Sequence, residues 1–335
     1  RDRDKWMPGI LADRGHDVEL WGVSDEPGLH EMDIEGMGAY TIRLFKNSSA
    51  GSKTKKHYSE ELIKYARENP SDLYVLKGVD GGVGVQLIRG YLLPESKPFA
   101  FVIGGKYYTR YVPQAEIVFY ETEEQKQHLM DPEWHFWRSP VEEEKLIRLP
   151  KSIDTDLFRP MPDERKQWDI ITVGRLIDRY KNYEPLGPLS EHFNMAVVGG
   201  GPAEESLKAQ YPRADFIGKV PHRQVPELLN RAGAFIHMGR NDYFPRVLVE
   251  AAACGCIPMA FADAIKEDVI PPETGLLLSR TNYIRGIHKL FQNPEKMKEI
   301  SETTRKYAKK YHNKFSSRKP LNKMLDRLNK MMGRF

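Results

Sequence analysis

The sequence predicts an α/β protein with two parallel-sheet domains, and three observations support this fold class. Short β-branched and aromatic runs alternate with longer helical stretches along the chain, which is typical of parallel α/β folds. Most of these runs begin about 20 residues apart, enough for one strand, a crossover helix and two turns. A length of 335 residues suits two domains with full cores better than one.

The predicted strands fall into two sets. In the first half they are Val18–Trp21, Thr41–Phe45, Leu73–Leu76, Phe99–Ile103, Ile117–Tyr120 and Lys145–Leu149. In the second half they are Asp169–Val173, Met195–Val198, Asp215–Ile217, Ala234–Met238, Ile257–Phe261 and Gly275–Leu278. Residues 6–15 have the pattern of a helix that follows a first strand, and we expect that strand and its loop to be missing from this sequence.

The boundary between the two domains is marked by prolines. Pro150, Pro160 and Pro162 punctuate a stretch without periodic apolar residues, which predicts a linker over residues 150–166. We therefore expect an N-terminal domain over residues 1–155, a second domain over 156–312 and a C-terminal helix within 313–335. Ligands of open parallel sheets bind outside the carboxyl ends of the strands, so a site is expected there.

Composition narrows the class of protein. Hydrophobic residues make up 40% of the chain and charged residues 29%, as in ordinary globular proteins. No apolar run approaches the roughly 20 residues that span a bilayer. Two closely spaced cysteines, Cys254 and Cys256, form no disulfide framework, which indicates a reducing compartment and hence the cytoplasm. Without a second cysteine pair, small buried residues explain them better than a metal site does.

The net charge of +4 is unevenly distributed. Residues 301–335 contain 11 Lys or Arg against only two carboxylates, so the preceding residues are net negative. Within this tail, Leu321–Met332 places its apolar residues on one helical face. Such a helix can lie peripherally on anionic lipid, but an apolar stripe usually faces a core, which favours packing on the first domain. The tail lacks the aromatic platforms of single-strand binders, which argues against nucleic acid.

Two polar segments stand outside the strand pattern. Residues 46–59 are polar, basic and contain glycine, which predicts a mobile loop. Gly78 and residues 80–82 follow a predicted strand, where Asp80 can line a ligand site or form a simple turn.

Glycines and cations follow the first predicted strand of the second half. Gly174 and Arg175 end that strand, and Lys181 lies six residues after Arg175. Two cations beside a sharp turn can hold a diphosphate. Taken alone, solvated surface cations explain them better, because charged residues mostly lie at the surface.

A glycine-rich turn follows the next strand. Gly199 and Gly200 precede a helix, where glycines allow close backbone approach to a phosphate or sugar. A tight turn explains these glycines equally well. A dinucleotide fingerprint would need a glycine at Glu204, so the sequence does not favour NAD binding.

The most informative segment runs from Asp242 to Gly255. Pro245 suits the first turn of a helix, an alanine-rich stretch continues it, and Gly255 ends it. Asp242 therefore lies in the loop before the helix, and Glu250 lies on its body about two turns further on. Each carboxylate alone is better explained as an N-cap or a solvated residue, but the whole arrangement is rarer.

This segment resembles the paired-acid motif of family 4 retaining glycosyltransferases, in which seven residues separate two glutamates before an alanine-rich helix. The resemblance extends over most of the chain. The similar segments are Gly15–Val18, Ser152–Phe158 with Pro160, Phe216–Val220 and Glu227–Ala234. It implies the GT-B fold, in which two Rossmann-like domains face each other across a cleft, with the acceptor on the first and the nucleotide sugar on the second.

The resemblance also implies a reaction. The family transfers a sugar from a nucleotide donor, here UDP- or GDP-linked, to an acceptor hydroxyl with retention of configuration, and usually requires no metal. The acceptor would be a carbohydrate, a lipid-linked compound or another hydroxyl compound. In the front-face mechanism commonly proposed for the family, the leaving phosphate takes the proton of the acceptor.

Matching positions imply the roles of individual residues. Arg175 and Lys181 would bind the diphosphate, Glu250 would hold the ribose, and Asp242 would hold the transferred sugar. The other donor-binding residues would be Gly174, Gly199, Gly200, Lys219, Val220, Tyr243, Phe244, Arg246 and Val247. On the acceptor side the candidates are Asp80, Gly104 and Gly105.

Two departures from the family pattern leave other functions open. Asp242 stands where glutamate is usual in the family. Gly104 and Gly105 follow Phe99–Ile103, the fifth strand of the first domain if the missing first strand is counted, and the family frequently has a histidine there. A GT-B nucleotide-sugar epimerase and a non-catalytic sugar-nucleotide-binding protein are the alternatives.

Overall fold

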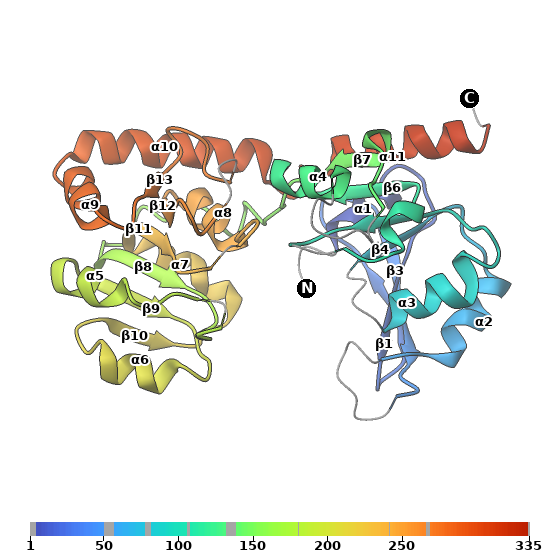
Figure 1. The fold of residues 1–335 in the computed structure, drawn as a ribbon, viewed down its shortest axis with the longest axis horizontal. Coiled ribbons are helices and arrows are strands. Elements are labelled where there is room, and N and C mark those ends of the chain that lie inside the picture. Colours follow the sequence, from blue (N-terminus) through green and yellow to red (C-terminus); the bar gives the residue numbers. More distant parts are fainter. Residues whose placement is uncertain are drawn as a thin grey trace. The chain divides into compact units, whose positions relative to one another are not determined.

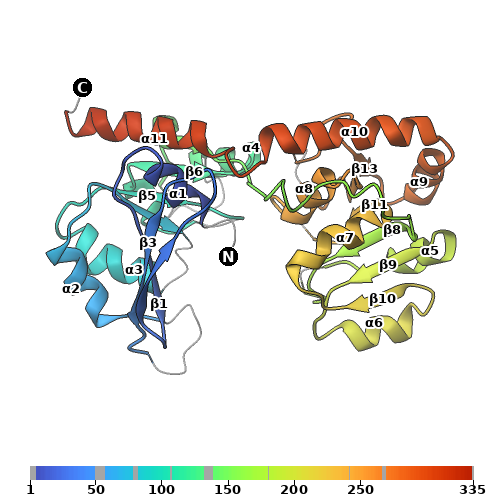
Figure 2. The ribbon, with the colours of Figure 1, turned by 180° about the vertical axis from the view of Figure 1, so that it is seen from behind.

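The computed structural model describes residues 5–49, 57–77, 82–105, 108–131, 139–179, 181–240, 242–265 and 269–333. The chain forms two compact units (Figures 1 and 2). The first unit contains Arg1–Pro150 and Ser317–Phe335, and the second contains Lys151–Ser316. The proline-rich segment after residue 150 thus belongs to the second unit, and the last helix belongs to the first.

The second unit is built on a six-stranded parallel sheet in the order β10-β9-β8-β11-β12-β13. Its strands are β8 (Trp168–Val173), β9 (Met195–Val198), β10 (Asp215–Gly218), β11 (Ala232–His237), β12 (Ile257–Phe261) and β13 (Leu276–Leu278). The strand order reverses between β8 and β11, which makes their carboxyl ends the expected ligand site.

Helices cover both faces of this sheet, because its strands are apolar on both sides. They are α5 (Leu186–His192), α6 (Glu204–Gln210), α7 (Val225–Asn230), α8 (Arg246–Ala253), α9 (Tyr283–Phe291) and α10 (Pro294–Tyr311). Phe235 of β11 packs in the core beneath α7 and α8, whereas its neighbour Ile236 packs with α5, α6 and α9 on the other face. The alternation along β11 therefore separates two apolar cores.

The first unit contains two sheets. Four parallel strands form one sheet: β4 (Tyr74–Lys77), β5 (Phe99–Val102), β6 (Ile117–Tyr120) and β7 (Leu146–Arg148). The other is β1 (Glu19–Ser24), β3 (Tyr40–Lys46) parallel to it, and β2 (Gly28–Met32) antiparallel to β3. The sequence does not predict β2, since this strand has no β-branched residue and a mostly exposed centre.

The helices of the first unit are α1 (Trp6–Ala12), α2 (Glu60–Glu68), α3 (Val83–Leu87), α4 (Glu123–Met130) and α11 (Arg318–Met331). Leu321, Met324 and Leu328 of α11 are buried. Arg318 forms an ion pair with Asp13 after α1 at 3.4 Å, and Arg327 Nη2 donates to the carbonyl of Leu146 in β7. The apolar face of α11 thus packs within the first unit. Among the described residues, no helix has the length and apolar character needed to cross a membrane.

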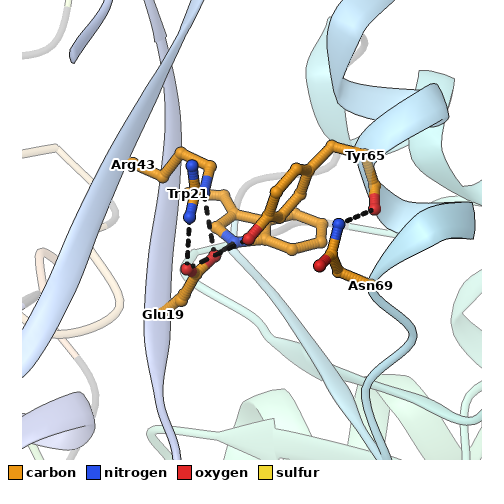
Figure 3. Close-up of polar contacts among 5 residues, drawn as sticks. All are labelled: Glu19, Trp21, Arg43, Tyr65 and Asn69. Atoms are coloured by element: carbon orange, nitrogen blue, oxygen red, sulfur yellow. Dashed lines mark hydrogen bonds and ion pairs between the residues drawn. The ribbon is translucent and has the colours of Figure 1, made fainter. Parts of the chain in front are cut away.

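One polar cluster ties β1, β3 and α2 together (Figure 3). Glu19 accepts hydrogen bonds from Arg43 Nη2 at 2.7 Å, from Trp21 Nε1 at 2.6 Å and from the Tyr65 hydroxyl at 3.2 Å. The Arg43 guanidinium also lies 4.1 Å from the centre of the Tyr65 ring. The cluster compensates the charge of a partly buried carboxylate between two strands and a helix.

Candidate functional site

The predicted site residues of the second unit follow the carboxyl ends of neighbouring strands. Gly174 and Arg175 follow β8, Gly199 and Gly200 follow β9, Lys219 follows β10, and Asp242 follows β11. Since all these strands are parallel, the loops that carry the residues lie at one edge of the sheet.

The glycines after β8 and β9 allow two loops to touch. The Gly174 amide donates to the carbonyl of Val198 at 2.9 Å. Gly199 has φ +140, and a Cβ on it would lie 1.8 Å from the carbonyl oxygen of Gly174. No other residue fits at Gly199 without moving the backbone.

An ion pair of α6 lies beside the turn after β9. A Cβ on Gly200 would lie 3.3 Å from Oε2 of Glu204, whose carboxylate forms an ion pair with Lys208 at 2.9 Å. Gly200 therefore lies beside an ion pair of α6.

Lys181 bridges the loops that follow β8 and β11. Its backbone pairs with Gly239, and its carbonyl accepts a hydrogen bond from Arg240 Nε at 2.8 Å. The ammonium lies 3.8 Å from the position that a Cβ on Gly174 would take. Burial lowers the pKa of Lys181, and the negative charge of Asp242 opposes that shift. Lys181 is therefore a desolvated cation beside a glycine turn.

The backbone of Asp242 is hydrogen-bonded, whereas its side chain is partly exposed. Its amide donates to the carbonyl of Ala264 at 2.8 Å, and it bridges to Ile265. The Asp242 side chain is 42% exposed, and its Oδ2 lies 3.6 Å from Nε2 of the buried His237. Burial, with a smaller contribution from Lys181, holds the pKa of His237 well below its usual value. The sequence alone does not single out His237 as a site residue; an imidazole at the end of an otherwise apolar strand is the available signal.

Glu250 is buried on α8 and has two basic partners. His222 Nε2 lies 3.1 Å from Oε1 of Glu250, and Arg246 Nε lies 2.9 Å from the same oxygen. Arg246 is one turn earlier on α8, so the pair is stabilised within the helix. The sequence does not predict His222, in a short 3-10 helix after β10, as a site residue. Its ring lies 5.2 Å from that of Phe158.

The remaining predicted donor residues occupy different environments. Tyr243 and Phe244 are each 4% exposed, so their side chains are buried within the second unit. Because α8 begins at Arg246, the amides of Arg246 and Val247 lie in its first turn, where backbone donors lack intrahelical partners. Arg175 and Lys219 are exposed, and Val220 packs against the core beneath α8.

The residues predicted for the acceptor side belong to the first unit. Gly104 and Gly105 follow β5, and Gln125 of α4 donates from Nε2 to the carbonyl of Gly105 at 2.8 Å. Gln125 also accepts from the amide of Glu121, a buried residue directly after β6. Asp80 lies outside the described residues. The sequence does not predict Glu121 and Gln125 as site residues.

The two cysteines are free and buried at the end of α8. Burial raises the pKa of Cys256 to about 12, so its thiol stays protonated and is a poor metal ligand. Within the part of the chain that the structure describes, no group of three or more His, Cys, Asp or Glu side chains could hold a metal ion.

Comparison with known proteins gives this site a family context. Residues 155–307, nearly the whole second unit, match the family glycosyl transferases group 1. The chain is 25% identical over 182 residues, 48% of its length, to a phosphatidylinositol N-acetylglucosaminyltransferase subunit of Arabidopsis thaliana. It is 30% identical over 155 residues, 40% of its length, to the putative glycosyltransferase EpsF of Bacillus subtilis (strain 168). The chain spans 40% of the length of each relative.

One solved structure is similar in fold to this chain over nearly its whole length. HepE from Anabaena, in complex with UDP, matches with a TM-score of 0.66, covering 93% of this chain and 100% of that one. The identity is 11%, so the likeness concerns the fold. The chain has the GT-B fold that the sequence predicts.

Proposed function

We propose that this chain is a retaining glycosyltransferase that moves a sugar from a UDP- or GDP-linked donor to an acceptor hydroxyl. One observation carries the proposal. Lys181 follows β8, Asp242 and Glu250 follow the adjacent parallel strand β11, and all three lie within the segment that matches glycosyl transferases group 1. The curated relatives are named as glycosyltransferases, and HepE was solved in complex with UDP, which supports a nucleotide-sugar donor.

The donor would use the polar groups at this edge of the sheet. The ammonium of Lys181 and the exposed guanidinium of Arg175 would neutralise the diphosphate. Glu250, held beside two basic partners, would accept hydrogen bonds from the ribose hydroxyls. Asp242 would accept from a hydroxyl of the transferred sugar, beside the amides of the first turn of α8. Lys219 and Val220 would lie beside the base.

Charge development explains how these groups would accelerate transfer. The acceptor oxygen bonds to the anomeric carbon while the bond from that carbon to the β-phosphate oxygen breaks. The departing diphosphate gains negative charge and takes the proton of the acceptor hydroxyl, so atoms and charge balance. A desolvated Lys181 interacts more strongly with this charge than a solvated lysine would.

Ligand-induced stabilisation and turnover test the proposal. We expect UDP or GDP to raise the melting temperature, and wild-type protein to transfer sugar from the matching donor. Glu250→Ala should abolish that stabilisation, and Lys181→Ala should lower kcat about 100-fold or more. Unchanged turnover in both variants would contradict the proposal.

The same assay separates the alternatives. An isomerised sugar without any acceptor would indicate an epimerase, and donor binding without turnover across an acceptor panel would indicate a non-catalytic binding protein. Glu205→Ala, an exposed carboxylate at the start of α6, is the matched control for loss of a charge and should behave as wild type.

A further inference from the structure

His237 is the last residue of β11 and has an unexplained polar atom. Its side chain is 2% exposed, and Nε2 has no hydrogen-bond partner among the described residues. Buried polar atoms are usually hydrogen-bonded because desolvation without a partner costs free energy. Oδ2 of Asp242 lies 3.6 Å from this nitrogen. This distance is longer than a hydrogen bond.

The loop after β11 holds the imidazole in this position. A Cβ on Gly239 would lie 2.0 Å from Nε2 of His237, so any larger residue would displace the ring. The backbone of Gly239 also pairs with Lys181. The turn at Gly239 therefore lies beside both Lys181, a desolvated cation, and the buried imidazole of His237. The partly exposed carboxylate of Asp242 follows three residues after Gly239.

Burial and the charge of Lys181 set the protonation state of the ring. Burial, and next the positive charge of Lys181, hold the pKa of His237 well below its usual value, so the ring is neutral at pH 7. A neutral imidazole has one N–H donor, and an ionised carboxylate is only an acceptor. The tautomer with its proton on Nε2 is therefore the one that Asp242 favours.

We infer that His237 is a positioning residue whose Nε2–H donates to Oδ2 of Asp242 and fixes that carboxylate for a hydroxyl of the transferred sugar. A small rotation of the partly exposed carboxylate of Asp242 closes the 3.6 Å separation to hydrogen-bond distance in solution, with or without the donor. Because His237 is buried behind Asp242, it acts through the carboxylate and does not touch the sugar. This inference rests on the proposed donor site and assigns part of its sugar specificity.

Binding of a nucleotide with and without its sugar tests the inference. In titration calorimetry, we expect His237→Leu to weaken binding of UDP-glucose about 5- to 20-fold while UDP affinity stays within about twofold. GDP-mannose and GDP replace this pair if the base is guanine. His237→Gln retains a donor near Nε2 and should recover most of the loss. Equal weakening of both ligands, or no rescue by glutamine, would overturn the inference.

Ile236→Val is the matched control, since Ile236 is a fully buried neighbour on the opposite face of β11. It should lower stability slightly and leave the ratio of the two affinities unchanged. A change in that ratio equal to the change in His237→Leu would show a packing effect and overturn the assigned role.

Nitrogen NMR of the histidine rings tests the contact without any donor. We expect His237 to show the neutral Nε2–H tautomer between about pH 6 and 8, and Asp242→Asn to shift its Nε2 resonance. An Nδ1–H tautomer, or an unchanged resonance in Asp242→Asn, would contradict the contact. If no nucleotide binds to the wild-type protein, the proposed function fails, while this measurement still decides the His237–Asp242 contact.

Discussion

Lys181 and Glu250 carry desolvated charges that the site compensates in different ways. Glu250 lies within 3.1 Å of His222 and 2.9 Å of Arg246, so its charge has partners before any ligand arrives. For Lys181, burial is the larger influence on the pKa, and the charge of Asp242 offsets it in part. A desolvated cation with little compensation gains more from a bound phosphate than a solvated one does.

The lowered pKa of Lys181 predicts how nucleotide binding depends on pH. The protonated ammonium attracts the diphosphate, so UDP affinity should fall as the pH rises through that lowered pKa. The fall should begin at a lower pH than an ordinary lysine would give. Titration calorimetry between about pH 7 and 10 measures it. Lys181→Arg keeps its charge to higher pH and should flatten the profile; an identical profile in this variant would exclude Lys181 as the titrating group.

At the scale of the elements, the Glu19 cluster connects β1, β3 and α2 (Figure 3). The hydrogen bond from Arg43 is the largest cause that holds the pKa of Glu19 below its ordinary value. The ionised form of Glu19 is therefore stabilised in the folded state relative to the unfolded state. This contribution is present above the unfolded pKa and is lost as the pH falls through the folded pKa.

Glu19→Gln tests this contribution to stability. We expect the free energy of unfolding to fall by about 1–2 kcal/mol at pH 7, because a charge-assisted hydrogen-bond network is weakened. The difference should narrow as the pH is lowered toward the folded pKa of Glu19. Urea unfolding measures it. Glu31→Gln, on exposed β2, should change stability little at either pH; an equal loss there would mean that the effect is not specific to the cluster.

The end of α8 depends on a single glycine. Gly255 has φ +75, and its carbonyl accepts a hydrogen bond from the Ser301 hydroxyl of α10 at 2.6 Å. A left-handed residue at this position ends the helix and lets the chain enter β12. The helix that carries Glu250 is thus tied to α10 at its carboxyl end.

Gly255→Ala should lower the free energy of unfolding by about 1–2 kcal/mol, since alanine is strained at positive φ. Its Cβ would also lie 3.0 Å from the Ser301 hydroxyl oxygen. Gly286→Ala in α9 is the matched control, because open space surrounds that position and alanine favours a helix. Thermal unfolding should show opposite shifts for the two variants; a stabilised Gly255→Ala protein would refute the account of the helix end.

At the scale of the whole molecule, the first unit is discontinuous in sequence. Its last helix, α11, follows the complete second unit, yet Leu321 and Met324 are buried among residues of the first unit. Packing thus accounts for the apolar face of this basic helix. The first unit is therefore completed by a helix that follows the second unit in the chain.

Leu321→Ala should lower the stability of the first unit by about 2–5 kcal/mol by creating a cavity. In calorimetry with UDP, the transition of the second unit should move with ligand concentration, whereas the transition lowered by Leu321→Ala should not. Met331→Ala, at a position 49% exposed near the end of α11, should have little effect. An α11 that instead lay on lipid would leave Leu321→Ala as stable as wild type.

Local pattern alone determined the α/β class and the strands of both parallel sheets. Buried strands are continuous apolar runs bounded by turn residues, so Ile257–Phe261 and its counterparts are legible without tertiary information. The helix between Asp242 and Gly255 could also be predicted from the sequence, because an alanine-rich helix and the glycine that ends it depend on local preferences. In contrast, β2 forms by pairing with β3, and its own residues do not favour a strand.

Only the tertiary structure decided which side chains meet. Glu250 is separated from His222 by 28 positions in the chain, and their contact requires the α8 helix and the turn after β10 to lie together. The role of His237 also depends on the tertiary structure, because it follows from the burial of the ring and from the nearby Lys181 and Asp242. Sequence periodicity reports which face of an element is apolar, whereas desolvation and charge pairing depend on distances between segments that are remote in the chain.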